Sequence, residues 1–193
     1  MMRLYSYIVA VDDGFAPCPM PGLCSLACCK PMIRRLARQG DWVMGTMPKE
    51  RGEGRLVYLM QVGRVLSFAD YYRDQKLRRR RDCIYRPLKC GGFRQKGNPW
   101  HGHSNIKKDL SGKNVLLAKR FVYFGENAQP VPPAFRRYVA RGQGHRVWGT
   151  PGAKAPNTIR PDTIKSLVQW AFSRGCGVRG KPFDPPRKHT NCE

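Results

Sequence analysis

The sequence predicts an α+β protein: a small, mixed, mainly antiparallel β-structure flanked by short helices, with a longer helix near the C-terminus. Short apolar stretches rich in β-branched and aromatic residues alternate with Gly- and Pro-rich turns, which is typical of strands. One stretch near the C-terminus has apolar residues at helical spacing instead. The length of 193 residues and a hydrophobic fraction of 41% fit one domain with its own core. We expect a single domain over residues 1–184, with a basic irregular insertion around residues 76–113 and a loosely ordered basic tail at 185–193.

The first elements are a strand, a loop and a short helix. Residues 4–11, "LYSYIVAV", form an unbroken β-branched and aromatic run, which predicts a buried strand. Residues 12–22 form a Gly- and Pro-rich loop. A helix is predicted from about Pro31 to Arg38, because proline is tolerated in the first turn of a helix and Gly40 can end it.

Two strands and a capped helix follow. The strands are "DWVMGT" and "LVYLMQVGRVLSF", which we expect to pair across the Gly-rich turn between them. The second strand is long and is expected to bend at Gly63. Ser67 is a candidate helix cap with Asp70 three residues on. Trp42, next to Val43 in the first strand, is expected in the core.

The second half begins with an irregular segment and ends with the clearest helix. Residues 78–113 are poor in apolar side chains and rich in Arg, Lys and Gly, which indicates a functional segment rather than core. "NVLLAKRFVYFG" restores a strand signal. "RPDTIKSLVQWAFSRG" is predicted to be helical, with Asp162 or Thr163 as its cap and Gly175 as its stop. Its apolar face comprises Ile164, Leu167, Val168, Ala171 and Phe172.

The charge balance indicates a polyanionic partner. The chain has 36 Lys and Arg against 13 Asp and Glu, a formal net charge of +23. A field of this sign favours phosphate backbones, so we expect nucleic acid, DNA in preference to RNA, or a nucleotide as partner. No stretch approaches the roughly 20 apolar residues of a membrane helix, so no membrane partner is expected. We expect a cytoplasmic protein with reduced thiols, and the sequence does not indicate its oligomeric state.

The cysteines do not have the spacing of a zinc site. Four of the eight lie within residues 18–29 as C-x5-C-x3-C-C, whereas structural zinc is held by C-x2–4-C pairs. We therefore expect no metal and no other cofactor. Cys24, Cys28 and Cys29 are interpreted as small buried hydrophobes. Four further candidates that also lack the zinc spacing are Cys83, Cys90, His101 and His103.

Other polar groups offer phosphate binding or acid–base chemistry. Arg78, Arg79, Arg80 and Arg81 form a run whose guanidinium groups match phosphate oxygens. Candidate acid–base groups are His103, His145 and Asp82, because imidazole titrates near neutral pH. No nucleophile elbow, Walker loop or dinucleotide fingerprint is present, so the motifs do not indicate a known enzyme class.

Nine motifs in order carry a family resemblance. "LYSYIVAVDDGFAPCP", "LCSLACCKPMIRR", "GDWVMGT", "LVYLMQV", "FADYYRD", "DCIY", "HS", "FVYFG" and "GQGH" resemble a nucleotide-modification-associated domain, the second of the families with that name, over about residues 3–184. The resemblance implies a place beside phage and bacterial systems that modify DNA bases, with base-modification enzymes as partners and the cytoplasm of a bacterium or phage-infected host as the compartment. Cys18 stands where that family usually has Asn. The motif positions include Asp12, Gly14, Phe15, Pro17, Cys24, Lys30, Pro31, Arg34, Gly40, Asp41, Trp42, Asp82, Tyr85, His103, Ser104, Tyr123, Gly125, Gly144 and His145.

The order of elements is also similar to the PUA-like domains, which include readers of modified bases and are built on a small, partly closed β-barrel. This similarity implies that the loop "DDGFAPCPMPG" lies at the mouth of a pocket. Phe15 would stack on a base, Asp12 would hydrogen-bond its edge, and Lys30 and Arg34 would meet the phosphate. The full set of base- or nucleotide-binding candidates is Asp12, Gly14, Phe15, Pro17, Lys30, Arg34, Tyr85, Tyr123 and His145.

Three functions are consistent with the sequence. The first is a nucleic-acid-binding domain that recognises a modified or flipped base in a DNA-modification system. The second is an enzyme of nucleotide or base modification that uses His and Asp as acid–base groups. The third is a basic protein that coats DNA without base preference.

Overall fold

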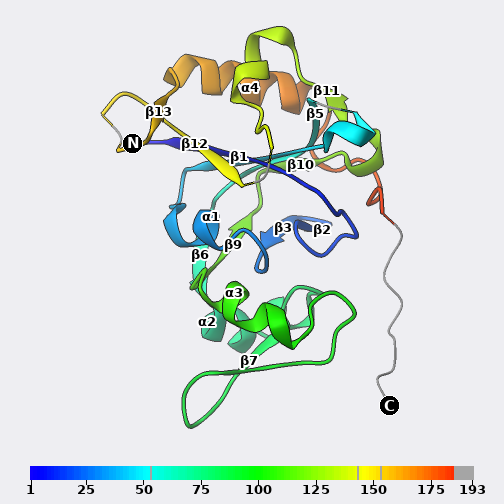
Figure 1. Cartoon of the computed structure of the whole chain (residues 1–193), viewed down its shortest axis with the longest axis vertical. Coiled ribbons are helices and arrows are strands. Elements are labelled where there is room, and N and C mark those ends of the chain that lie inside the picture. The colour runs from blue at the N-terminus through cyan, green and yellow to red at the C-terminus, as the bar shows by residue number, and fades with distance from the viewer. Residues whose placement is uncertain (53, 143, 153, 185–193) are drawn as a thin grey trace.

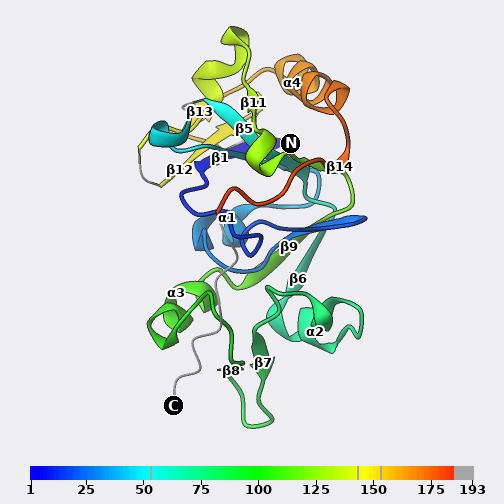
Figure 2. The ribbon, with the colours of Figure 1, turned by 90° about the vertical axis from the view of Figure 1, so that its right-hand side faces the viewer.

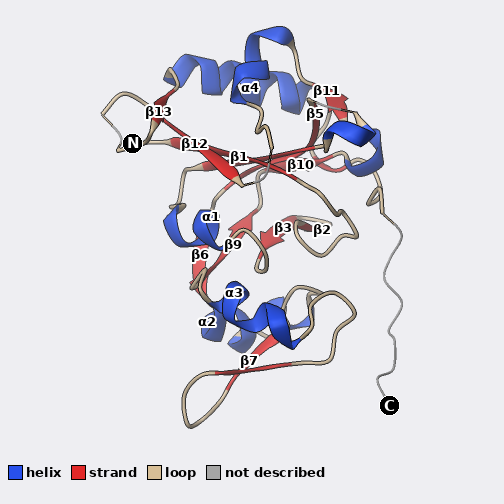
Figure 3. Ribbon diagram, viewed as in Figure 1, coloured by secondary structure: helices blue, strands red, loops and turns tan. Residues whose placement is uncertain are grey.

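The computed structural model describes residues 1–52, 54–142, 144–152 and 154–184 (Figure 1). The fold is mixed α+β with mostly antiparallel sheets, few short helices and a C-terminal helix, as the sequence predicts. Its layers are stacked along the long axis: helix α4 (Pro161–Ser173), a large sheet, a smaller sheet, and a lobe of short helices and a hairpin (Figures 1 and 3). None of the described helices combines the length and apolarity that crossing a bilayer requires.

The large sheet has the strand order β13-β12-β1-β4-β5-β10-β14, with β11 added on β5. β1 runs parallel to β4 and antiparallel to β12. β4 and β5 pair antiparallel, which confirms the pairing expected across the Gly-rich turn. The strands are β1 (Arg3–Ile8), β4 (Trp42–Thr46), β5 (Arg55–Gln61), β10 (Phe121–Tyr123), β11 (Gln129–Pro130), β12 (His145–Gly149), β13 (Asn157–Thr158) and β14 (Gly177–Val178).

Both faces of the large sheet are buried, because alternate side chains of each strand enter different cores. On one face Leu4 and Trp42 pack with Leu167 of α4, so Trp42 is a core residue as predicted. On the other face Tyr5 and Tyr7 enter a cluster that includes residues of the smaller sheet and of α1 (Pro31–Leu36). The smaller sheet has the order β2-β3-β9-β6, with β2 (Cys18–Met20), β3 (Leu23–Leu26), β9 (Asn114–Ala118) and β6 (Arg64–Ser67).

The lobe at the end opposite α4 has a third core. Phe15, Phe68 and Tyr85 are buried in it, and the β7–β8 hairpin projects from it in Figure 2. The segment predicted to be an irregular insertion, residues 76–113, supplies much of this lobe and contains short helices and a hairpin. The elements of the lobe are α2 (Phe68–Arg73), β7 (Tyr85–Pro87), β8 (Phe93–Gln95) and α3 (Ile106–Leu110). The 3-10 turns of the chain are η1 (Lys49–Arg51), η2 (Leu77–Arg79), η3 (His103–Asn105), η4 (Gly125–Asn127) and η5 (Pro133–Tyr138).

The long strand expected at residues 56–68 is two strands in two sheets. The N–H group of Gly63 donates to the carbonyl of Leu117 in β9, which draws the chain from the large sheet into the smaller one. Ser67 caps α2 by accepting from the N–H of Asp70, as predicted. At α4 the N-cap is Arg160, without a side-chain cap bond, so the expected cap by Asp162 or Thr163 is wrong. Proline at the first position of α4 sets the helical φ there instead.

Barrel closure stays a prediction. Within the described residues the pairings of the large sheet end at β13 on one side and β14 on the other. The predicted loose tail at 185–193 lies outside the described residues.

Candidate functional site

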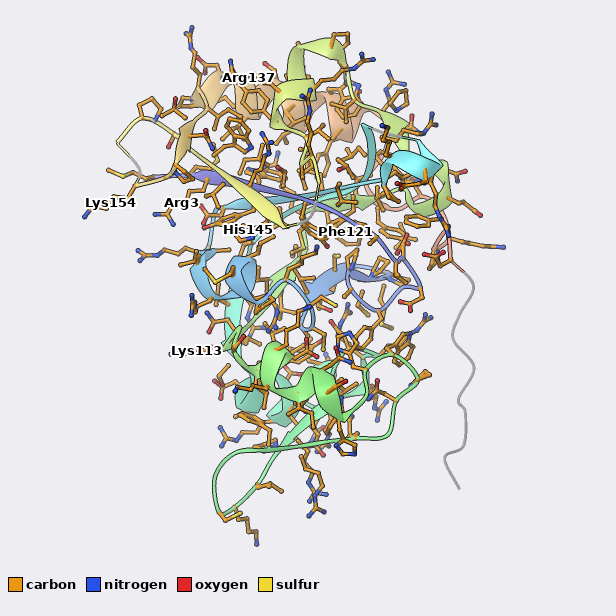
Figure 4. All side chains as sticks on the ribbon, viewed as in Figure 1. Arg3, Lys113, Phe121, Arg137, His145 and Lys154 are labelled. Atoms are coloured by element: carbon orange, nitrogen blue, oxygen red, sulfur yellow. The ribbon has the colours of Figure 1, made fainter. Side chains whose placement is uncertain are left out.

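A cleft of about 840 Å³ opens where the end of β1 meets the start of α1 and the loop that precedes α3. Figure 4 shows His145, one of its lining residues, at the start of β12 near the middle of the molecule. The lining combines apolar and aromatic walls with a rim that holds more cations than acids. The charged side chains of the lining are Lys30, Lys49, Lys108, Arg141, Asp13 and Glu50.

Three side chains at this cleft form a thiol–imidazole–carboxylate relay. Cys29 Sγ lies 3.4 Å from Nε2 of His101. On the other side of the ring, Nδ1 of His101 lies 2.5 Å from Oδ2 of Asp109. Cys29 and His101 both line the cleft, whereas Asp109 is buried behind them. In this order a thiol can pass its proton to an imidazole that a carboxylate holds in place, which is the arrangement of an activated cysteine nucleophile.

The carboxylate of Asp109 is fixed by two further donors. The hydroxyl of Tyr85 donates to Oδ2 at 2.7 Å, and the backbone N–H of Cys29 donates to Oδ1 at 2.9 Å. Burial opposes ionisation of Asp109, but hydrogen bonds from His101 and Tyr85 outweigh it and lower the pKa of the carboxyl. Burial likewise opposes protonation of His101, yet its bonds to Asp109 and Cys29 raise its pKa to about 9. His101 therefore carries a positive charge near neutral pH and donates to Asp109 through Nδ1.

Cys29 lies on a strained turn between strand β3 and helix α1. Its φ is +58°, and the φ of the next residue, Lys30, is +38°, so two consecutive side chains are in the left-handed region. Each such residue costs about 1–3 kcal/mol, and backbone strain of this kind clusters at functional sites. A strand–turn–helix with the nucleophile at the turn presents its side chain to the substrate.

Arg34 holds together the segments that carry the relay. It is completely buried, and its guanidinium donates to the carbonyls of Cys29, Asp109 and Asn114 at 2.7, 2.6 and 2.9 Å. Because Arg34 is buried and fully bonded in this way, its guanidinium has no exposed face for the phosphate that the similarity to PUA-like domains implied. Arg34 thus positions Cys29 and Asp109 relative to each other.

Aromatic rings form the wall behind the imidazole. Phe15 stacks on Trp100 with ring centroids 4.8 Å apart and an interplanar angle of 5°, and its edge-to-face contact with His101 is at 5.0 Å. Phe15 is 2% exposed, so one of its faces is already covered by Trp100. In this arrangement the ring supports His101 as much as it lines the cleft.

Among the described residues, the group of potential metal ligands that lies close together is Cys28, His101 and Asp109, with ligand atoms within 4.8 Å of one another. The Cys28 thiol is buried and donates to the backbone carbonyl of Asp82 at 3.7 Å, and burial raises its pKa well above its usual range. His101 and Asp109 are joined by the hydrogen bond described above. The geometry therefore fits the relay better than a metal centre.

Several predicted binding residues lie behind the cleft rather than in its lining. Asp12 is buried beside Tyr123, whose hydroxyl donates to it at 2.6 Å, and burial raises the pKa of Asp12 to about 6. Tyr85 is buried, and its hydroxyl donates to the carboxylate of Asp109. Gly14 and Pro17 are buried in the loop that carries Phe15. The predicted base-binding residues that line the cleft are Phe15, Lys30 and His145.

The predicted phosphate and acid–base residues are dispersed. Arg78, Arg79 and Arg81 are exposed in the lobe opposite α4, and His103 is exposed in η3. Arg80 is 7% exposed and donates to the Ser25 hydroxyl and to backbone carbonyls. Asp82 is buried, accepts from Ser25 and Tyr71, and forms an ion pair with Arg80 at 3.8 Å.

The sequence patterns missed the relay itself. Cys24 and Cys28 are buried as predicted, but Cys29 is half-buried and faces His101, so its interpretation as a small buried hydrophobe is wrong. The available signals were the doubled cysteine before "KP" and the histidine loop at 101–103. Their meeting could not be read from spacing, since Cys29 and His101 are 72 residues apart in the chain.

The fold and this cleft define an α+β domain with a thiol–imidazole–carboxylate centre. The family model described as nucleotide modification associated domain 2 matches residues 1–187, so the chain belongs to that family, as its motifs indicated. No curated protein and no solved structure was found to match the chain.

Proposed function

We propose that the protein is a cysteine-dependent enzyme of nucleotide modification, which transfers an acyl group to or from a nucleotide or base bound in the cleft. The observation that carries this proposal is the alignment of Cys29, His101 and Asp109 at the cleft wall. Membership of a nucleotide-modification family supports the choice of substrate.

The relay supports a two-step acyl transfer. In the reacting form of the site, Nε2 of His101 holds the proton of the Cys29 thiol, and the sulfur attacks the carbonyl carbon of an ester or amide. His101 then returns that proton to the leaving group as the thioester forms. An amine or water attacks the thioester, passes a proton to His101, and the thiol of Cys29 is regenerated. Asp109 keeps Nε2 of the ring directed at the sulfur throughout.

The cleft lining suits a nucleotide. Lys30, Lys108 and Arg141 place cations where a phosphate would enter, and half-buried Trp100 supplies aromatic surface for a base. Lys30 follows Cys29 directly in the sequence, and its Nζ atom lies 4.6 Å from the centre of the Tyr7 ring. Lys30 is thus a candidate to neutralise negative charge that develops on the substrate.

A non-catalytic reader of a modified or flipped base is the second candidate. The same aromatic and basic lining favours it, since readers hold a base by stacking and by polar loop groups. A protein that only binds a base does not require an activated thiol. The reactivity of Cys29 therefore separates the two functions.

The first test is the rate at which each cysteine is alkylated by iodoacetamide near neutral pH, followed by peptide mass spectrometry. Cys90 and Cys176 are exposed and provide internal references for ordinary thiols. We expect half-buried Cys29 to react faster than both by about tenfold, because Nε2 of His101 lies 3.4 Å from its sulfur and a neighbouring base activates a thiol. A Cys29 rate equal to or below that of the references contradicts the enzyme and favours the reader.

The assignment of His101 has a matched control. His101→Gln should remove the rate advantage of Cys29, whereas His103→Gln, two residues away and exposed, should leave it unchanged. Circular dichroism verifies that both variants are folded. A chelator is included as a third arm: a change in the Cys29 rate on chelation would point to a metal at Cys28, His101 and Asp109 instead.

A further inference from the structure

Besides the cleft, a groove lies along helix α1 and the N-terminal half of strand β1, at Arg3 and Tyr5. Its volume is about 710 Å³, and its charged lining residues are all basic: Arg3, Arg35, Arg38 and Lys154. Figure 4 shows Arg3 and Lys154 on the same side of the molecule, both to the left of His145 in that view. A groove with this lining attracts phosphate groups.

The groove and the catalytic cleft follow one another along the same strands. Tyr5 lines the groove and Tyr7 lines the cleft, and these residues lie on one face of β1. The paired residues of β12 line the same two hollows. Val147, opposite Tyr5, lines the groove, and His145, opposite Tyr7, lines the cleft. From Arg3 to Tyr7 the strand advances by about 13 Å at roughly 3.3 Å per residue. A stacked single strand covers this length with about four nucleotides at roughly 3.4 Å each.

Exposed apolar side chains join the two hollows. Met32 lines the cleft and Leu36 lines the groove, and both are 39% exposed one turn apart on α1. Val65, 36% exposed, lies on the groove wall as well. Arg35 reaches back along this ridge, with its guanidinium 2.9 Å from the sulfur of Met32. The result is an apolar ridge with cations beside it, running from the groove to the cleft.

We propose that this groove binds a single-stranded nucleic acid, or an unpaired stretch of one, and delivers one of its bases to Cys29. The phosphates contact Arg3, Arg35, Arg38 and Lys154, and the bases contact Met32 and Leu36. The delivery step rests on the proposed function, but the groove is a binding site whether or not Cys29 is catalytic. The substrate of the enzyme is then a polymer rather than a free nucleotide.

The composition of the groove favours a single strand over a duplex. A duplex presents phosphates and hides its base faces, so it would leave the ridge of Met32 and Leu36 in water. A single strand offers both phosphates and apolar base faces, which match the two kinds of side chain in the groove. A base can also enter the cleft only when it is unpaired or flipped out of its stack.

The test is a fluorescence anisotropy titration of labelled polythymidine of about 12 nucleotides, within the range of sites that bind single strands. The variant Arg35→Glu/Arg38→Glu is compared with Arg78→Glu/Arg79→Glu, which makes the same charge change at exposed arginines of the opposite lobe. The sequence predicted phosphate binding at that second pair, so the comparison decides between the two sites. We expect the groove variant to lose at least about tenfold in affinity and the control variant to stay within about twofold. The magnitude of the slope of log K against log[salt] should fall by about 1.4 in the groove variant, because two phosphate contacts are removed.

Three results would overturn the proposal. Equal losses in the two variants would mean that net charge alone binds nucleic acid. Tighter binding of the matching duplex than of the single strand would contradict the occupant. An unchanged affinity of the groove variant would place the binding site elsewhere. If the reversal variant does not fold, Arg35→Gln/Arg38→Gln replaces it and should give the same order of affinities with smaller differences.

The alkylation assay separates this inference from the proposed function. Saturating polythymidine should slow the alkylation of Cys29 in the wild type, while exposed Cys176 should react as before. In the absence of oligonucleotide, Arg35→Glu/Arg38→Glu should retain the Cys29 rate of the wild type. An unreactive Cys29 with intact groove binding would refute the enzyme alone, and a reactive Cys29 without groove binding would refute the groove alone.

Discussion

His101 determines the electrostatics of the site at the scale of single residues. Its ring lies between the Cys29 sulfur and the Asp109 carboxylate, and its side chain is 13% exposed. Burial opposes the charge, but the two partners raise its pKa from 6.5 to about 9. The folded protein therefore binds a proton here more tightly than the unfolded chain does.

This shift predicts a stability that depends on pH. A raised pKa in the folded state contributes stability that is fully present below pH 6.5 and is lost as the pH rises through about 9. His101→Gln should therefore cost most below pH 6.5, by roughly 3 kcal/mol, and little above pH 9. Urea unfolding of the wild type and of the variant at the two ends of this range measures the difference. A cost that is independent of pH would contradict the charged contact with Asp109.

His145 provides the opposite sign as a control. Burial and the nearby charge of Lys30 lower its pKa, so its neutral form is favoured in the folded protein. Stability linked to this group is present above its unfolded pKa and is lost on acidification. His145→Gln should accordingly make the protein less sensitive to acid, whereas His101→Gln removes stabilisation at the same pH.

Residue-level chemistry was only partly visible in the sequence. The similarity to PUA-like domains implied a pocket beside the loop 12–22, and Phe15 and Lys30 line the cleft, whereas Asp12 does not. Cys29, His101 and Asp109 come from three separate segments and have no common spacing. Their relation depends on how the lobe folds against α1, which local patterns do not encode.

At the scale of elements, Arg34 links α1 to α3 and β9. Its three carbonyl acceptors belong to the turn before α1, to α3 and to the first residue of β9. The guanidinium also lies 5.4 Å from the centre of the Phe68 ring in α2. A buried cation shared by four segments fixes their mutual positions.

Arg34→Met should therefore destabilise the protein by about 3–5 kcal/mol, because it leaves three buried carbonyls without their donor. Arg35→Met, next to it but exposed, should change stability by no more than about 0.5 kcal/mol. Thermal unfolding of the two variants measures the contrast. Equal melting temperatures would show that Arg34 does not hold α1 against α3.

Elements defined by local signals were predicted, and elements that depend on distant partners were not. The cap at Ser67 and the pairing of β4 with β5 follow from residues close in sequence. The division of the long strand at Gly63 depends on Leu117, which lies in another part of the chain. The cap of α4 was mistaken because proline at the first helical position needs no side-chain acceptor at the N-cap.

At the scale of the whole molecule, the net charge of +23 acts on stability as well as on binding. Like charges over a small domain repel one another in the folded state, and this repulsion is strongest at low salt. The exposed arginine pair in the groove and the pair in the opposite lobe carry the same charge, so each adds to this repulsion. The sequence predicted this global term, but only the fold distinguishes where the cations lie relative to the cleft.

The two charge-reversal variants test how far this global term extends. Each reversal of one arginine removes two charges, so either double variant falls from +23 to +19. Both Arg35→Glu/Arg38→Glu and Arg78→Glu/Arg79→Glu should raise the melting temperature in low-salt buffer, because the lower net charge reduces repulsion within the folded protein. Each variant also places Glu in the last turn of a short helix, which opposes this gain in both, so the two gains should be similar. The gain should disappear at about 1 M NaCl, where the Debye length is only about 3 Å. If one variant is stabilised and the other destabilised, local contacts outweigh the effect of net charge. If both are stabilised alike and only the groove variant loses affinity for polythymidine, the charge has two separable effects. The effect on binding then belongs to the groove.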